Sequence, residues 1–154
     1  MDIIDFVRHL SLAAFALALK AAVAGPAIID SAANFAPGFV WQEHSIVSGN
    51  FDCSGRKQQA ILGMNKREIA IVMFLHGTRK RPEILRFSAT VRNPDSAELT
   101  VESLDYNPEA EIGADLPGFQ RSMTCQGLNL SDGEVDSAHI YWNHNSNHFE
   151  DWSR

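Results

Sequence analysis

The stretch GNFDCSGRKQQAILGM, residues 49–64, joins a glycine-closed loop to a strand-like run. Side chains that carry oxygen occupy alternate loop positions, at Asn50, Asp52 and Ser54, and Gly55 permits a tight turn. The run Gln58–Met64 alternates in part between polar and apolar residues, which is typical of a β-strand. The stretch therefore predicts the start of a β-meander.

Strand signals recur along the rest of the chain and are separated by short polar turns. Residues 68–75 are apolar on both faces, as expected for a central strand that is covered on both sides. The predicted strands are residues 39–47, 58–64, 68–75, 83–91, 98–104 and 127–130. The sequence predicts one all-β domain over residues 39–154, mainly antiparallel, built as a sandwich or as paired propeller-like blades.

The loop at residues 50–59 resembles the cation-binding loop of FG-GAP and VCBS-type β-repeats, in which Asp-x-Asp-x-Asp-Gly leads directly into a strand. The resemblance implies that Asn50, Asp52 and Ser54 are calcium ligands, with Gln58 where a further carboxylate is common. Only one of these side chains is a carboxylate, and a basic pair follows at once. A metal-free Asx-type turn is therefore the alternative.

Residues 1–24 have the features of an export signal peptide. An apolar run at residues 10–19 follows a basic start, and Ala22-Val23-Ala24 fits the cleavage pattern. An amphipathic helix kept in the mature protein is the alternative, because two acids and Lys20 disturb the pattern. The run is shorter than the roughly 20 residues of a membrane span, so no span is expected after cleavage. Residues 25–38 are interpreted as an N-terminal tether.

The two cysteines, Cys53 and Cys125, are expected to form a disulfide if the chain is exported. Both lie in polar, loop-like contexts; two buried free thiols are the alternative. Closing a loop of roughly 70 residues stabilises the fold by about 4 kcal/mol in the chain-entropy model. The bridge would also hold the loop at residues 49–55 against the C-terminal half.

Residues 138–152 combine aromatic and hydrogen-bonding side chains around the turn His144-Asn145-Ser146-Asn147. A hairpin with this turn pairs Asn143 with His148 and His139 with Trp152. Alternation directs Ile140, Trp142 and Phe149 into the core. The opposite face carries His139, Tyr141, Asn143, His148, Glu150 and Trp152.

That opposite face is typical of a recognition surface, with His139, Tyr141, His148 and Trp152 as binding residues. Packing beneath a neighbouring loop is the alternative. Zinc is not expected, because His139 and His148 lie about 13 Å apart at strand rise.

A second group of acids, Asp132, Glu134 and Asp136, alternates along an extended segment. Three like charges repel unless a cation lies among them, which makes the group a further calcium candidate. A solvated acidic edge is the alternative. Residues 106–118 are interpreted as a surface loop, either a lid or binding loop or a plain acidic solvated connection.

Charge is distributed unevenly along the chain. Residues 56–92 carry nine basic residues against two acids, whereas the rest of residues 25–154 has a net charge of −13. In a meander, the turn after strand 68–75 lies at the same end as the loop before strand 58–64. We therefore expect a basic patch that steers acidic partners. Its residues are Arg56, Lys57, Arg79, Lys80 and Arg81.

These features favour a periplasmic or secreted, non-catalytic binding protein whose partner is a protein of the cell envelope. Small exported β-domains with FG-GAP-like loops resemble some bacterial inhibitors or immunity proteins that block cell-wall hydrolases, which is an analogy of fold only. One alternative is an envelope hydrolase that uses the face of His139, His148 and Glu150; another is a structural accessory domain. Nucleic acid is a poor fit for an exported, net acidic chain.

Overall fold

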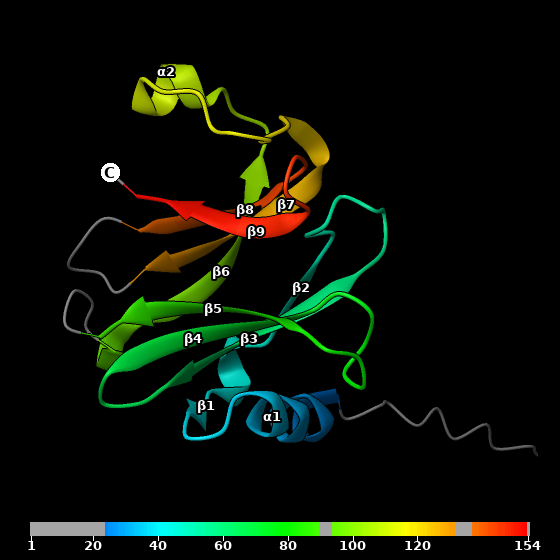
Figure 1. Cartoon of the computed structure of the whole chain (residues 1–154), viewed down its shortest axis with the longest axis vertical. Coiled ribbons are helices and arrows are strands. Elements are labelled where there is room, and N and C mark those ends of the chain that lie inside the picture. Colours follow the sequence, from blue (N-terminus) through cyan, green and yellow to red (C-terminus); the bar gives the residue numbers. More distant parts are fainter. Residues whose placement is uncertain (1–23, 90–93, 132–136, 154) are drawn as a thin grey trace, which may run out of the picture.

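The computed structural model describes residues 24–89, 94–131 and 137–153. Residues 1–23 of the predicted signal peptide and the acids Asp132, Glu134 and Asp136 lie outside them. Within the described residues the chain forms two antiparallel sheets that lie face to face (Figure 1). The predicted all-β, mainly antiparallel fold is confirmed.

The first sheet follows the order β1-β3-β4-β5, and β2 also pairs with β3. Its strands are β1 (Val40–Trp41), β2 (Val47–Gly49), β3 (Gln58–Met64), β4 (Glu68–Phe74) and β5 (Glu83–Ser88). Strand β3 has the predicted bounds, and β4 ends one residue before the predicted end.

The second sheet is a meander in the order β6-β7-β8-β9. Its strands are β6 (Glu98–Leu104), β7 (Ser122–Ser131), β8 (Ala138–Asn143) and β9 (His148–Trp152). The prediction for β7 was too short, because the strand begins at residue 122 rather than 127. It pairs with β6 as far as Leu104↔Ser122, across a register shift after Ser103. Cys125 therefore lies in a strand rather than in a loop.

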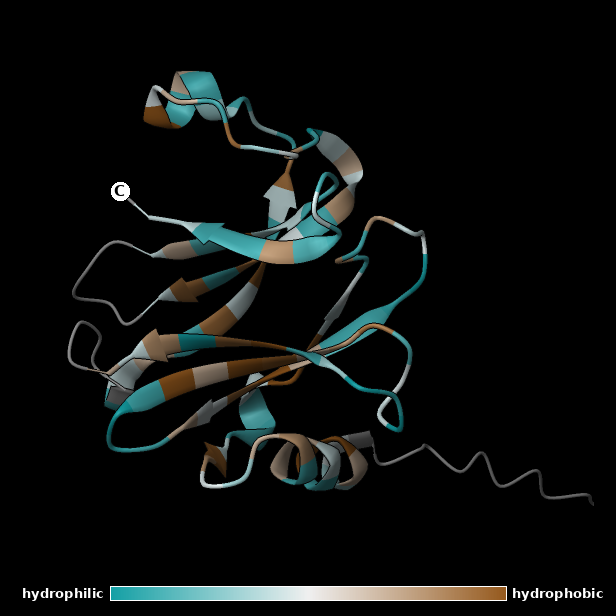
Figure 2. Ribbon diagram, viewed as in Figure 1, coloured by the Kyte–Doolittle hydropathy of each residue, from teal (hydrophilic) through white to brown (hydrophobic). Residues whose placement is uncertain are grey.

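The two sheets share one apolar core between them. Buried side chains of β3 and β4, among them Leu62 and Ile71, pack with those of β7 and β8, among them Leu128 and Ile140. Figure 2 shows hydrophobic residues concentrated on the strands and hydrophilic residues on the connecting loops. This is the arrangement of a sandwich.

A helix covers the outer face of the first sheet. Helix α1 (Ala24–Phe35) buries Ile28 and Ala32 against Ile61 and Val72 of the sheet (Figure 1). It occupies most of the segment interpreted as a tether. The two-sided apolar pattern of β4 is thereby explained, since one face meets the other sheet and the opposite face meets α1.

The strand predicted at residues 39–47 is interrupted. A short 3₁₀ helix, Glu43–Ser45, separates β1 from β2. The hydroxyl of Ser45 accepts a hydrogen bond from the Leu62 amide at 2.9 Å and donates to the Gln42 carbonyl at 2.7 Å. The Ser45 hydroxyl thus accepts the hydrogen bond that a backbone carbonyl of a neighbouring strand would otherwise accept from β3. The chain can therefore leave its pairing with β3 after β1 and resume it at β2.

Two further short elements complete the described chain. A 3₁₀ helix, Pro94–Ser96, precedes β6, and helix α2 (Pro108–Ile112) lies within the predicted surface loop. The Asn107 side chain accepts from the Glu109 amide at the start of α2, and Gly113 ends it in a left-handed conformation.

Candidate functional site

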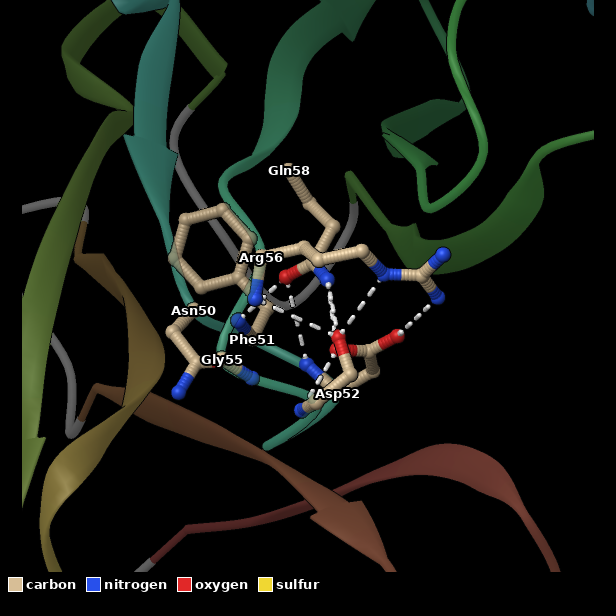
Figure 3. A network of polar contacts seen from close by, with 7 residues as sticks. Asn50, Phe51, Asp52, Gly55, Arg56 and Gln58 are labelled. Carbon is tan, nitrogen blue, oxygen red and sulfur yellow. Dashed lines mark hydrogen bonds and ion pairs between the residues drawn. The ribbon is translucent and has the colours of Figure 1, made fainter.

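The loop between β2 and β3 is closed by a network of its own hydrogen bonds (Figure 3). The Gln58 side chain is buried; its Oε1 accepts from the Phe51 amide at 2.6 Å, and its Nε2 donates to Asp52 Oδ1 and, at 3.2 Å, to Ser54 Oγ. Asn50 Oδ1 accepts from the Gly55 amide at 2.9 Å. The network gives the loop a defined shape without any added ion.

The oxygens that the resemblance assigns to calcium therefore already accept hydrogen bonds from the protein. Asp52 and Ser54 face the amide of Gln58, and the Arg56 guanidinium lies 4.0 Å from Asp52 Oδ2. In the described part of the chain no three His, Cys, Asp or Glu side chains lie together in a way that could hold a metal ion. The second calcium candidate, at Asp132, Glu134 and Asp136, lies outside the described residues.

A disulfide joins Cys53 of this loop to Cys125 of β7, as predicted. Hydrogen bonds connect the same two segments: Gln126 N donates to Asn50 O at 3.0 Å, and the Asn50 side-chain Nδ2 donates to Thr124 O at 3.1 Å. The loop of the first sheet is thus fixed to the first half of β7 in the second sheet.

The five predicted basic residues lie on two loops at one end of the first sheet. The pairing Gln59↔Phe74 puts the start of β3 beside the end of β4, so the β2–β3 and β4–β5 loops share that end, on the right in Figure 1. All five side chains are exposed. Among the described residues no carboxylate lies within ion-pair distance of Lys57, Arg79, Lys80 or Arg81. We call this surface the basic end.

The C-terminal hairpin has the predicted register. Asn143 pairs with His148, Trp142 with Phe149, and His139 with Trp152. Ile140, Trp142 and Phe149 belong to the core between the sheets, as predicted.

The opposite face of the hairpin is divided between covered and open parts. Tyr141 and Asn143 are buried, because the segment at Pro117–Phe119 crosses over them. The Tyr141 hydroxyl donates to the Pro117 carbonyl at 3.1 Å, and burial raises its pKa to about 12. Tyr141 and Asn143 therefore pack beneath a neighbouring loop, which was the alternative to a recognition surface.

His139 and Trp152 instead line a pocket of about 470 Å³. The pocket lies between the ends of β6, β8 and β9 and helix α2. Its lining residues are Glu102, Ser103, Tyr106, Glu111, Ser137, His139 and Trp152.

A carboxylate and an imidazole are paired in this pocket. Glu102 Oε2 lies 2.8 Å from His139 Nδ1, and the imidazole stacks on the Trp152 indole with ring centroids 4.1 Å apart. Trp152 Nε1 donates to the Tyr106 hydroxyl at 3.2 Å. An ionised Glu102 can only accept, so Nδ1 then carries a proton; in the neutral imidazole Nε2 is the acceptor, whereas in imidazolium both nitrogens donate.

Burial raises the pKa of Glu102, against the opposing effects of His139 and the Asn129 side chain. Its other oxygen, Oε1, is buried and has no hydrogen-bond partner among the described residues. Burial also raises the pKa of Tyr106. The pocket thus holds a partly desolvated carboxylate between aromatic walls.

The structure does not bring the three residues of the predicted hydrolase face together. His148 Nδ1 lies 3.5 Å from Glu83 of β5, and its side chain is exposed. Glu150 accepts from the Tyr141 and Ser146 hydroxyls, each at 3.3 Å. His139 alone of the three lines the pocket.

Glu102, Tyr106 and Glu111 were not named individually as binding residues, although Tyr106 and Glu111 belong to the segment 106–118, for which a lid or binding loop was one interpretation. Glu102 is opposite Gly127 of β7, and Asn129 of β7 is opposite His139 of β8. The Glu102–His139 contact therefore depends on the register of three strands, which the turns of the sequence do not specify.

Comparisons with known proteins leave the chain without an assigned relative: no family model, no curated protein and no solved structure matches it. In the described part of the chain, no helix has the length and apolar character needed to cross a membrane.

Proposed function

We propose that this chain is an exported, non-catalytic binding protein whose partner is an acidic protein of the cell envelope, such as a cell-wall hydrolase that it inhibits. The observation that carries the proposal is the basic end, where five exposed cations lie on two adjoining loops. Four of the five, all except Arg56, have no carboxylate within ion-pair distance among the described residues, and such cations create a positive potential that attracts and orients an acidic partner.

One of the two loops is also held in a fixed shape. The disulfide ties the β2–β3 loop to β7, and Gln58 holds the loop from within. A surface that is ordered before binding loses less conformational entropy on association. This supports binding through the basic end rather than a purely structural role.

Export is supported by two features. A disulfide persists in an oxidising compartment such as the periplasm or the extracellular space. Residues 1–24 have the pattern of a signal peptide.

The test is a quantitative pull-down from envelope extract with the disulfide-bonded protein and two charge-reversed variants. Arg79→Glu/Lys80→Glu changes the basic end. The matched control, Lys66→Glu/Arg67→Glu, makes the same change in net charge on exposed residues of the β3–β4 turn, at the opposite end of β4.

We expect the parent and the control to enrich one envelope protein that the basic-end variant does not. That partner is then purified, and its own activity is measured with increasing amounts of the parent. Equal capture by both variants would contradict binding through the basic end. Full activity of the captured enzyme at saturation would contradict inhibition.

A hydrolase is the second candidate, and one observation favours it. The 2.8 Å contact between Glu102 and His139 lies in a pocket and leaves His139 Nε2 available as a general base. The measurement is turnover of cell-wall fragments by the purified protein and by His139→Gln. Turnover lost in the folded variant would favour the enzyme over the binding protein.

A further inference from the structure

The pocket lined by residues of β6, β8 and β9 is separate from the basic end, and the proposed binding function does not involve it. Its volume, about 470 Å³, is within the range of small-ligand sites and is large enough for one long side chain. Strands supply Glu102, His139 and Trp152, whereas Tyr106 lies in the connection between β6 and α2.

The two oxygens of the Glu102 carboxylate differ in their surroundings. Oε2 lies 2.8 Å from His139 Nδ1, and Oε1 is buried without a donor among the described residues. A buried acceptor without a donor is unfavourable, and a charged acceptor more so. A cation in the pocket would offset this cost by stabilising the charged form of the carboxylate.

The pocket lining has an acidic character. Two carboxylates, Glu102 and Glu111, line the pocket, and no lysine or arginine of the described residues does. The basic residue Arg121 is engaged outside the lining, where its Nε donates to Asp105 Oδ1 at 2.7 Å. An anion would be repelled here, whereas an organic cation would find a carboxylate partner.

Tyr106 and Trp152 form aromatic walls of the pocket. Trp152 is fixed by its hydrogen bond to Tyr106 and by stacking with His139, and both aromatic residues line the pocket. Indole and phenol rings attract cations, most strongly where water is partly excluded. A carboxylate beside two such rings suits a guanidinium or an alkylammonium group.

We propose that this pocket binds an organic cation, namely the arginine or lysine side chain of a peptide, with Glu102 as the charged partner and Trp152 and Tyr106 as the aromatic walls. The site is separate from the basic end. The two surfaces have opposite charge preferences, so each can fail its test without the other.

The experiment is isothermal titration of the disulfide-bonded protein with N-acetyl-arginine methylamide and with its neutral isostere, N-acetyl-citrulline methylamide. The lysine analogue is titrated in parallel. We expect the arginine or lysine probe to bind at least tenfold more tightly than citrulline, and added salt to reduce this preference. Equal affinity for arginine and citrulline, or heat of binding from neither cation, would overturn the proposal.

Two variants locate the interaction. Glu102→Gln keeps the shape of the side chain and removes its charge, and we expect it to weaken binding of the preferred cation about tenfold or more. The control, Glu109→Gln, makes the same charge change on α2 at an exposed residue outside the lining, and its affinity should stay within about twofold. Both are checked by near-ultraviolet circular dichroism. Unchanged affinity in folded Glu102→Gln would overturn the assignment, and the comparison of arginine with citrulline tests the proposal even if that variant does not fold.

Discussion

The side-chain amide of Gln58 donates to the carboxylate of Asp52 from within the β2–β3 loop. The same amide group donates to the Ser54 hydroxyl, and the Gln58 carbonyl oxygen accepts from the Phe51 amide. A donor of the protein thus faces the oxygens that the FG-GAP-like pattern would direct at a cation.

Replacing Gln58→Glu should make the stability of the protein depend on calcium. The new carboxylate would face Asp52 without a donor, so we expect the free energy of unfolding to fall by about 2 kcal/mol or more in chelator. About 10 mM calcium should restore about 1–2.5 kcal/mol, if the new site binds with the millimolar or somewhat tighter affinity of extracellular calcium modules. Urea unfolding with and without calcium measures both effects.

Two controls accompany that measurement. Gln58→Leu loses the same hydrogen bonds but gains no ligand, so calcium should not restore its stability. The parent should show no shift in the unfolding midpoint with calcium; a clear shift would mean that the parent itself binds the ion, either at this loop or at Asp132, Glu134 and Asp136.

Removing the disulfide should destabilise the protein strongly. Cys53 and Cys125 are 72 residues apart in sequence, and a loop of this length corresponds to about 4 kcal/mol in the chain-entropy model. We expect Cys53→Ala/Cys125→Ala to lose about that amount in urea unfolding. A reducing agent should have a similar effect on the parent and none on the variant. A loss below about 1 kcal/mol would show that the hydrogen bonds from Asn50 to β7 already hold the loop.

Helix α1 should contribute to stability as part of the fold. Ile28 is fully buried against the first sheet, so Ile28→Ala should cost about 2–5 kcal/mol. Asp30 is exposed on the same helix, and Asp30→Ala should change stability by no more than about 0.5 kcal/mol. Thermal or urea unfolding of the two variants makes the comparison. Equally small effects would indicate that the segment is only a tether.

The parts of the fold that the sequence predicted depend on contiguous residues. The hairpin register follows from four turn residues and alternation, and Asn143 Oδ1 supports that turn by accepting from the Asn145 amide at 2.8 Å. The two-sided apolar pattern of β4 predicted a covered central strand. What covers its outer face could not be read from β4 itself, because α1 lies more than 30 residues earlier in the sequence.

The parts that were missed depend on partners far apart in sequence. Ser45 interrupts the first strand by bonding to Leu62, a contact that alternation along residues 39–47 does not reveal. The pocket depends on the register of β6, β7 and β8, which brings Glu102 within 2.8 Å of His139. Of the hairpin residues predicted to form a recognition surface, His139 and Trp152 line the pocket, whereas Tyr141 is buried.

Glu102 should make stability depend on pH in the direction opposite to that of most acids. Burial raises its pKa in the folded protein above 4.5, so the folded state takes up a proton before the unfolded state does as the pH falls. Its contribution to stability is therefore lost as the pH rises through the folded pKa and regained as the pH falls toward 4.5. Four groups act on this carboxylate or face it in the pocket: His139, Asn129, Tyr106 and Glu111.

The measurement compares urea unfolding of the parent and Glu102→Gln between pH 7 and about pH 4.5, the usual value for this carboxyl. We expect the parent to gain stability relative to the variant as the pH falls, because the parent alone carries the Glu102 carboxyl, whose pKa burial raises. Glu109→Gln serves as the reference, since it removes an exposed acid from the same region. If the difference between parent and Glu102→Gln instead moved in the opposite direction, the interaction with His139 would outweigh burial, and the pKa of Glu102 would be lowered in the folded protein.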